Sequence, residues 1–200
     1  MSTKTQDRAA RAAATLAAAL AAAATRAPDP APDPQAQDRE PDPHDVARQI
    51  VLRQLAMGPR SRAELEQKLA RRDCPPDVAE AVLDRMTDVG LVDDDAYAQM
   101  FVRTHLARRG LARSALAREL RAKGIEDDLA DQTLASVSDA DERDRARALA
   151  DKKLRSMHGL EIEVQTRRLA GMLVRKGYSS GVVYAVIREA IAEAPEHLPD

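Results

Sequence analysis

The sequence has no tryptophan, one phenylalanine and three tyrosines among its 200 residues. A large single core normally takes much of its buried area from aromatic side chains. A chain with so few of them favours small units, in which Leu, Val, Ile, Met and Ala side chains pack between short helices. The composition therefore argues against one large compact core.

Cysteine is equally scarce, since Cys74 stands alone. A lone cysteine forms no intramolecular disulfide, which suits a reducing compartment. The four histidines are scattered, and no Cys/His cluster has the spacing of metal ligands. No stretch approaches the roughly 20 strongly apolar residues of a membrane span. We expect a cytoplasmic protein that uses no cofactor or metal and does not contact membranes.

The first 43 residues differ in composition from the rest. Residues 9–25 are nearly all alanine, and residues 27–43 read APDPAPDPQAQDREPDP. Each proline there removes a hydrogen-bond donor and restricts the residue before it, so this second part cannot form a helix. A secretory leader is not favoured, because the apolar run is mostly alanine and Asp7 lies among the basic residues. We predict a disordered extension over 1–43 and a short tail over 195–200.

One signature recurs three times after this extension. In this signature two leucines are four residues apart, and an Asp or Gly stands four residues after the second leucine. The three copies, each written with the residue that follows, are Leu65-x3-Leu69-x3-Asp73-Cys74, Leu116-x3-Leu120-x3-Gly124-Ile125 and Leu169-x3-Leu173-x3-Gly177-Tyr178. The copies are spaced by 51 residues, from Asp73 to Gly124, and by 53 residues, from Gly124 to Gly177. A unit copied at a fixed period is the mark of a repeat architecture.

The register of the copies holds on both sides of the signature. Downstream, each copy has a helical stripe of mostly apolar residues: Val78, Val82, Leu83, Met86; Leu129, Thr133, Leu134, Val137; Val182, Val186, Ile187, Ala190. Upstream, matched pairs extend the stripe: Val46 and Ile50, Tyr97 and Phe101, Ala150 and Leu154. The sequence predicts an all-α domain over 44–194, with three tandem three-helix repeats (about 44–92, 93–138 and 139–194) forming an elongated curved stack.

Capping signals agree with these helices. Ser61-x-x-Glu64 fits a capping box, and Ser179 can cap the last helix. Gly124 and Gly177 each follow a cationic last turn and precede an apolar residue, the pattern of a left-handed C-terminal cap. Asp73 replaces this glycine in the first copy, so its cap is expected to be strained or differently built.

The net charge of −2 conceals a segregation of charge. Between Arg103 and Lys123 there are seven cations and a single acid, Glu119. A second cluster lies in the acid-free window from Val164 to Arg188 and comprises Arg167, Arg168, Arg175 and Lys176. Both clusters fall on the second helix of a repeat or on its approach. Such a surface favours a polyanion or an acidic protein as partner.

The same cations also allow a simpler interpretation, in which they are solvated and neutralised by neighbouring acids. The acids available are Asp93–Asp95, Asp127, Asp128, Asp139 and Asp141. Tyr97 and Phe101 fall on the predicted core stripe, so a dedicated stacking platform for single-stranded nucleic acid is not expected.

Motifs for catalysis are weak. Asp93–Asp95 immediately precede a predicted helix, where aspartates cap the end and complement its dipole. The sequence suggests no Ser/His/Asp or Cys/His grouping and has no phosphate-binding glycine loop. We therefore expect a binding protein and not an enzyme.

The repeats resemble the bacterial RecX regulatory proteins over about residues 44–194. The resemblance is carried by the three-repeat layout, by Asp94-Asp95-Ala96-Tyr97-Ala98 through Arg118-Glu119-Leu120-Arg121-Ala122-Lys123-Gly124-Ile125, and by Arg168-Leu169-Ala170-Gly171-Met172-Leu173-Val174-Arg175-Lys176-Gly177-Tyr178-Ser179. It implies a cytoplasmic modulator of the RecA recombinase in recombinational DNA repair and the SOS response. Proteins of this kind lie along the groove of the RecA–single-stranded DNA filament and suppress strand exchange, ATP hydrolysis and co-protease activity.

On this resemblance, the expected partner is the RecA filament, with single- or double-stranded DNA as a further contact, and the chain is expected to be a monomer. The residues nominated for RecA or DNA binding are Arg109, Arg113, Arg118, Arg121, Lys123, Arg168, Arg175 and Lys176. Three of them, Lys123, Arg175 and Lys176, have an alternative role as cations at helix C-termini.

Two other functions remain open at the level of sequence. One is a sequence-independent DNA-binding module that acts without RecA, and the other is a helical-repeat adaptor with an unrelated protein partner. Purely electrostatic DNA binding would weaken steeply with salt, whereas a docked protein complex would keep a salt-resistant part.

Overall fold

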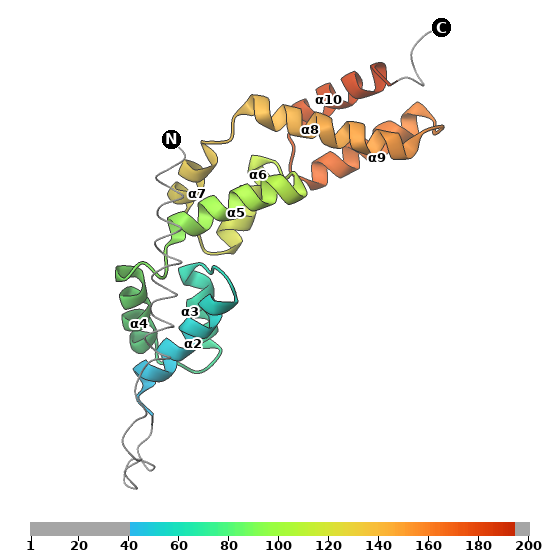
Figure 1. Cartoon of the computed structure of the whole chain (residues 1–200). Coiled ribbons are helices and arrows are strands. Elements are labelled where there is room, and N and C mark those ends of the chain that lie inside the picture. The colour runs from blue at the N-terminus through green and yellow to red at the C-terminus, as the bar shows by residue number, and fades with distance from the viewer. Residues whose placement is uncertain (1–40, 195–200) are drawn as a thin grey trace. The chain divides into compact units, whose positions relative to one another are not determined.

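The computed structural model describes residues 41–194, and the predicted extension over 1–43 and tail over 195–200 lie outside this range apart from residues 41–43. Over the described range the chain forms nine α-helices and no strand (Figure 1). The first repeat comprises α2 (Pro43–Met57), α3 (Arg62–Ala70) and α4 (Pro76–Asp88). The second comprises α5 (Asp94–Arg109), α6 (Arg113–Ala122) and α7 (Asp127–Leu134). The third comprises α8 (Asp139–Leu154), α9 (Ile162–Arg175) and α10 (Ser180–Ala192), with a short 3-10 turn after α8 (Arg155–Met157).

The predicted all-α fold of three three-helix repeats is confirmed. The described chain divides into two compact units, one ending at Tyr97 and one beginning at Ala98, so that α5 belongs to both. In the first unit, α2, α3 and α4 enclose an aliphatic core that includes Val51, Leu65 and Leu83. In the second unit, α8, α9 and α10 enclose a core that includes Leu169 and Val186.

The first helix of the first repeat departs from the predicted stripe. Val46 is 41% exposed, and the buried residues of α2 are Ala47 and Val51. In the second repeat the matching residue, Tyr97, is buried and donates its hydroxyl hydrogen to Glu64 of the preceding repeat at 3.2 Å. Val46 has no preceding repeat in the described part of the chain to cover it, so the prediction of a buried Val46 was wrong.

The N-terminal caps form as their sequence signals indicate. Ser61 Oγ accepts the backbone N–H of Glu64 at 3.2 Å, and the Glu64 carboxylate accepts the N–H of Ser61 at 3.3 Å. Ser179 Oγ accepts the N–H of Val182 at the start of α10. Asp93 accepts the N–H of Ala96 at 2.9 Å, which satisfies a donor in the first turn of α5.

The C-terminal caps of α6 and α9 share one geometry. Gly124 and Gly177 have φ of +75° and +90°, in the left-handed region that glycine adopts without strain. The next residue in each case donates to a carbonyl five residues back, from Ile125 to Leu120 and from Tyr178 to Leu173. These are the hydrogen bonds of a Schellman motif.

Asp73 adopts the same conformation as the two glycines, with φ of +56°. Its N–H donates to Ala70 O at 3.1 Å, and the N–H of Cys74 donates to Leu69 O at 3.2 Å. The first repeat therefore has the same cap as the others, built on a residue that occupies the left-handed region less readily than glycine does.

Candidate interaction surface

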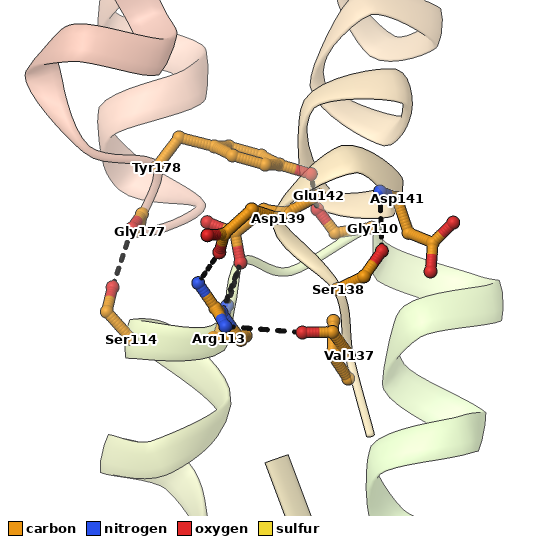
Figure 2. A network of polar contacts seen from close by, with 10 residues as sticks. All are labelled: Gly110, Arg113, Ser114, Val137, Ser138, Asp139, Asp141, Glu142, Gly177 and Tyr178. Atoms are coloured by element: carbon orange, nitrogen blue, oxygen red, sulfur yellow. Dashed lines mark hydrogen bonds and ion pairs between the residues drawn. The ribbon is translucent and has the colours of Figure 1, made fainter. Parts of the chain in front are cut away.

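Arg113 lies at the first position of α6 and binds the beginning of the third repeat (Figure 2). Its backbone N–H donates to the Glu142 carboxylate at 2.9 Å, and its Nε lies 3.4 Å from the same oxygen. The guanidinium also forms an ion pair with Asp139 and donates to Val137 O at 3.3 Å. The backbone nitrogen, Nε and Nη2 of this arginine thus contact acids of the adjacent repeat, and Nη1 contacts the segment that leads into it. Arg113 is therefore a structural clamp between the second and third repeats.

Hydrogen bonds to the α9–α10 turn complete the junction between these repeats. Ser114 Oγ donates to Gly177 O at 2.6 Å, and the Tyr178 hydroxyl donates to Gly110 O at 3.0 Å, as Figure 2 shows. The backbone N–H of Ala112 donates to Lys176 O at 2.9 Å. The short side chain of Ser114 and the absent side chain of Gly177 let the two segments approach closely.

Two titrating groups at this junction have shifted pKa values. Burial raises the pKa of Tyr178 to about 12, because the phenolate would lose its solvation. Burial and the nearby charge of Arg109 lower the pKa of Lys176, whose ammonium donates to the Arg109 carbonyl. Lys176 is thus held by the backbone of the second repeat and is less available to an external anion.

A second arginine clamp lies in the first unit. Arg62 begins α3, 51 residues before Arg113, and its N–H donates to Asp94 Oδ1 at 2.8 Å. Its guanidinium forms an ion pair with Asp84 at 2.6 Å. Arg62 is not among the cations nominated from the sequence. The available signal was the repeat alignment, which places Arg62 and Arg113 at the same position of successive copies.

Other nominated cations also have partners within the chain. Arg109 Nη1 lies 2.9 Å from Glu119. Arg121 forms an ion pair with Asp127 and lies 3.8 Å from Asp131 of α7. Lys123 is half-buried at the end of α6. Within the seven-cation segment of the second repeat, Arg109 is therefore compensated by Glu119 of the same segment, and Arg113 and Arg121 by acids beyond it.

Three nominated cations are exposed and pair with no carboxylate within residues 41–194: Arg118, Arg168 and Arg175. Arg168 and Arg175 are seven residues apart on α9, two helical turns, so they share one side of that helix. Arg118 lines an open groove of about 520 Å³ with Val174 and the α9–α10 turn. Among the nominated cations, the exposed and unpaired ones thus belong to α6 and α9 of the second unit.

The exposed side of the third helix differs between repeats. In α4 it carries Asp77, Glu80 and Asp84, and in α7 it carries Asp127, Asp128 and Asp131. The corresponding positions of α10 hold Gly181, Tyr184 and Arg188, with Ser180 beside them. In the first two repeats these acids pair with arginines of the preceding helix, as Arg62–Asp84 and Arg121–Asp127 show. The third repeat has no such acids on α10, so the arginines of α9 stay uncompensated.

The part of the chain that the structure describes offers neither a metal-binding cluster nor a membrane-spanning helix. Within residues 41–194, no three His, Cys, Asp or Glu side chains lie together in an arrangement that could hold a metal ion. In the same part of the chain, no helix has both the length and the apolar character needed to cross a bilayer.

Comparison with known proteins identifies each repeat separately. Family models match the RecX first three-helix domain over residues 47–86, the second over 93–134 and the third over 140–187. The chain is 46% identical over 171 residues to the Regulatory protein RecX of Streptomyces coelicolor, covering 83% of this chain and 91% of that protein. It is also 46% identical over 145 residues to the Regulatory protein RecX of Thermobifida fusca, covering 72% and 78%.

Two solved structures have a similar fold. One is the crystal structure of RecX from Lactobacillus salivarius, with a TM-score of 0.66 and 24% identity, covering 74% of this chain and 97% of that chain. The other is a crystal structure of regulatory protein RecX, with a TM-score of 0.66 and 27% identity, covering 74% of each chain.

Proposed function

Because this chain belongs to the RecX family of regulatory proteins, we propose that it binds the RecA–single-stranded DNA filament along its groove and inhibits the recombinase, ATPase and co-protease activities of RecA. It acts in the cytoplasm, as a monomer and without catalysis of its own. The observation that carries this proposal is the match of all three repeats, in order, to the three RecX domains.

The surface we assign to the filament consists of Arg118, Arg168 and Arg175. These three are the nominated cations that remain exposed and unpaired with acids in the described chain. Arg113 and Arg121 belong to the same nominated set, but both form ion pairs within the chain. Arg113 pairs with Glu142 and Asp139, and Arg121 pairs with Asp127. A cation already paired within the chain contributes less to an external anion, because binding would have to break the existing pair.

The mechanism we propose is bridging of adjacent RecA subunits. A chain of small repeats presents successive contacts, and engagement of two subunits by one molecule multiplies weak affinities. Bridging would hinder the addition of subunits and the motions between subunits that accompany ATP turnover.

The test is ATP hydrolysis by RecA preassembled on single-stranded DNA and titrated with this protein. We expect inhibition by the wild type at amounts below that of RecA, and clearly weaker inhibition by a variant with Arg118→Ala, Arg168→Ala and Arg175→Ala. A matched control removes three exposed arginines of the first repeat, by Arg53→Ala, Arg71→Ala and Arg85→Ala. Both variants lose three positive charges, so a difference in their inhibition of RecA would depend on where the three arginines lie.

Two outcomes would contradict the proposal in different ways. Equal loss in the two variants would indicate a general effect of charge and not the assigned surface. An absence of inhibition by the folded wild type would reject RecA regulation. Binding to naked DNA with a steep salt dependence would then favour the DNA-binding module, and failure to bind either DNA or filament would favour the adaptor.

A further inference from the structure

We propose that Tyr184 and Arg188, on the exposed side of α10, stack an unpaired base of single-stranded nucleic acid. The inference deepens the proposed function and rests on it for the source of the strand, which is the DNA of the filament. Tyr97 and Phe101, the aromatic residues on the predicted core stripe, are both buried and so are not available for this role.

The exposure of Tyr184 is the first observation. Its side chain is 71% exposed, whereas Tyr97, Phe101 and Tyr178 are at most 7% exposed. An aromatic ring left in water adds little to the stability of the fold, since the free energy of burial is not gained. Within the described chain, Tyr184 is thus the aromatic ring that is available to a ligand.

The second observation is the position of Arg188. Its guanidinium carbon lies 5.9 Å from the centre of the Tyr184 ring, one helical turn further along α10. This distance is within the range of a cation–π contact. Arginine and tyrosine planes both stack on bases, and the guanidinium also attracts the adjacent phosphate.

The third observation comes from comparing the repeats. Tyr184 corresponds to Glu80 and Asp131 in the first two repeats, and Arg188 corresponds to Asp84 and Ala135. A polyanion would be repelled by the acidic versions of this helix face. Only the version in the third repeat combines an aromatic ring with a cation.

The charge of the α9–α10 segment and the open space at Gly181 also fit a nucleic acid strand. Residues 164–188 contain five cations and no acid. The first acid beyond them, Glu189, forms an ion pair with Arg143 of α8. Apart from the adjacent residues and backbone of α10 itself, no atom lies within 4 Å of where a Cβ would stand on Gly181, three residues before the ring, so a strand can approach the helix there.

A protein partner fits these observations less well. Energetically important contacts between proteins also use Tyr and Arg, but they cluster in well-packed, fully desolvated pockets. The exposed neighbours of Tyr184 on α10 are Ser180, Gly181 and Arg188, and no other large apolar residue of this helix is exposed. A single ring beside a cation, with no other exposed large apolar residue on α10, suits the π-face of a base.

The experiment compares binding to two fluorescein-labelled strands of equal length and charge, oligo(dT) and the same backbone with abasic residues. We expect Tyr184→Ala to weaken binding to oligo(dT) by roughly 5- to 150-fold, the range for loss of one stacked base, and to leave binding to the abasic strand unchanged. Tyr184→Phe should keep wild-type affinity, because it retains the ring. Tyr184→Leu is the matched control, which restores apolar area without a π-face and should behave as Tyr184→Ala.

Equal binding of the wild type and Tyr184→Ala to oligo(dT), or an equal loss on both strands, would overturn the inference. So would rescue by leucine, which would indicate simple apolar contact. If Tyr184→Ala weakens inhibition of RecA while binding to oligo(dT) is unchanged, the ring contacts protein and the inference is wrong. Base-dependent binding by a wild-type protein that fails to inhibit RecA would reject the proposed function alone.

Discussion

Gly177 lies so close to Ala115 that a Cβ added to Gly177 would stand 2.7 Å from the Ala115 Cβ. The same added atom would stand 2.9 Å from the Ala115 backbone nitrogen. The glycine therefore serves two purposes, since it ends α9 in a left-handed conformation and lets the α9–α10 turn contact α6.

We expect Gly177→Ala to lower the free energy of unfolding by about 2–4 kcal/mol, the sum of left-handed strain and overpacking. Gly159→Ala is the matched control, because Gly159 has φ of +77° but nothing within 4 Å of its Cβ position. It should cost only about 1–2 kcal/mol, from backbone strain. Urea denaturation of both variants measures the difference. Equal costs would show that the close approach to Ala115 does not matter.

Asp73 offers the opposite change. With φ of +56°, it holds the left-handed position that glycine holds in the other two repeats. Asp73→Gly should raise the free energy of unfolding by about 0.5–1 kcal/mol, as relief of strain exceeds the entropy that glycine adds to the unfolded chain. The midpoint of thermal unfolding reports it, with Asp73→Ala as a control that should destabilise. A glycine variant less stable than the wild type would contradict the strained cap.

Tyr178 makes the free energy of unfolding of the second unit decrease at alkaline pH. Its pKa rises from 10.0 in the unfolded chain to about 12 in the folded one. The folded state therefore holds its proton more tightly, and the resulting stability is complete below pH 10 and is lost as the pH rises from 10 to 12. The loss is on the order of 2 kcal/mol.

Tyr178→Phe isolates this effect, because other groups that titrate in the same range are common to both proteins. The variant should be less stable than the wild type at pH 8, where it lacks the hydrogen bond to Gly110 O. The gap in urea midpoint should narrow by pH 12. A gap that stays constant between pH 8 and pH 12 would show that the phenol does not titrate with a raised pKa.

Arg113 and Arg118 lie five residues apart on α6 and should respond differently to truncation. Arg113→Ala leaves Glu142, whose side chain is 12% exposed, without its guanidinium partner. The expected loss is about 1–2 kcal/mol in the free energy of unfolding, since Arg113 is itself partly solvated. Arg118→Ala, at an exposed position, should change stability by less than about 0.5 kcal/mol.

In the inhibition of RecA the order of the two variants should be reversed, with the larger effect from Arg118→Ala. At a temperature where both are folded, Arg118→Ala weakens inhibition and Arg113→Ala changes it little. Circular dichroism melts and the ATPase titration supply the two readouts. If Arg113→Ala reduces inhibition as much as Arg118→Ala while remaining folded, Arg113 contacts the filament despite its ion pairs.

The sequence by itself determined the repeats and the ends of their helices. A helix cap depends on a few consecutive residues. The conformations of Ser61-x-x-Glu64 and of the Lys123-Gly124-Ile125 segment are therefore determined by their local sequence. The downstream stripe of each copy likewise follows from helical spacing alone. The burial of Val46 was predicted wrongly because the prediction used helical spacing alone. The exposure of Val46 depends on whether another repeat covers it, and helical spacing contains no such information.

Only the tertiary structure decided which cations are available to a partner. Arg113 pairs with Glu142, 29 residues further along the chain, and an ion pair of that kind depends on how one helix packs against another. Counting charges in a window therefore grouped Arg113 with Arg118, although one is a clamp and the other is exposed. The repeat alignment shows that Tyr184 replaces Glu80 and Asp131 of the other copies, but it does not show that Tyr184 is exposed. A side chain is buried or solvated according to the segments that fold against it, and those segments are distant in sequence.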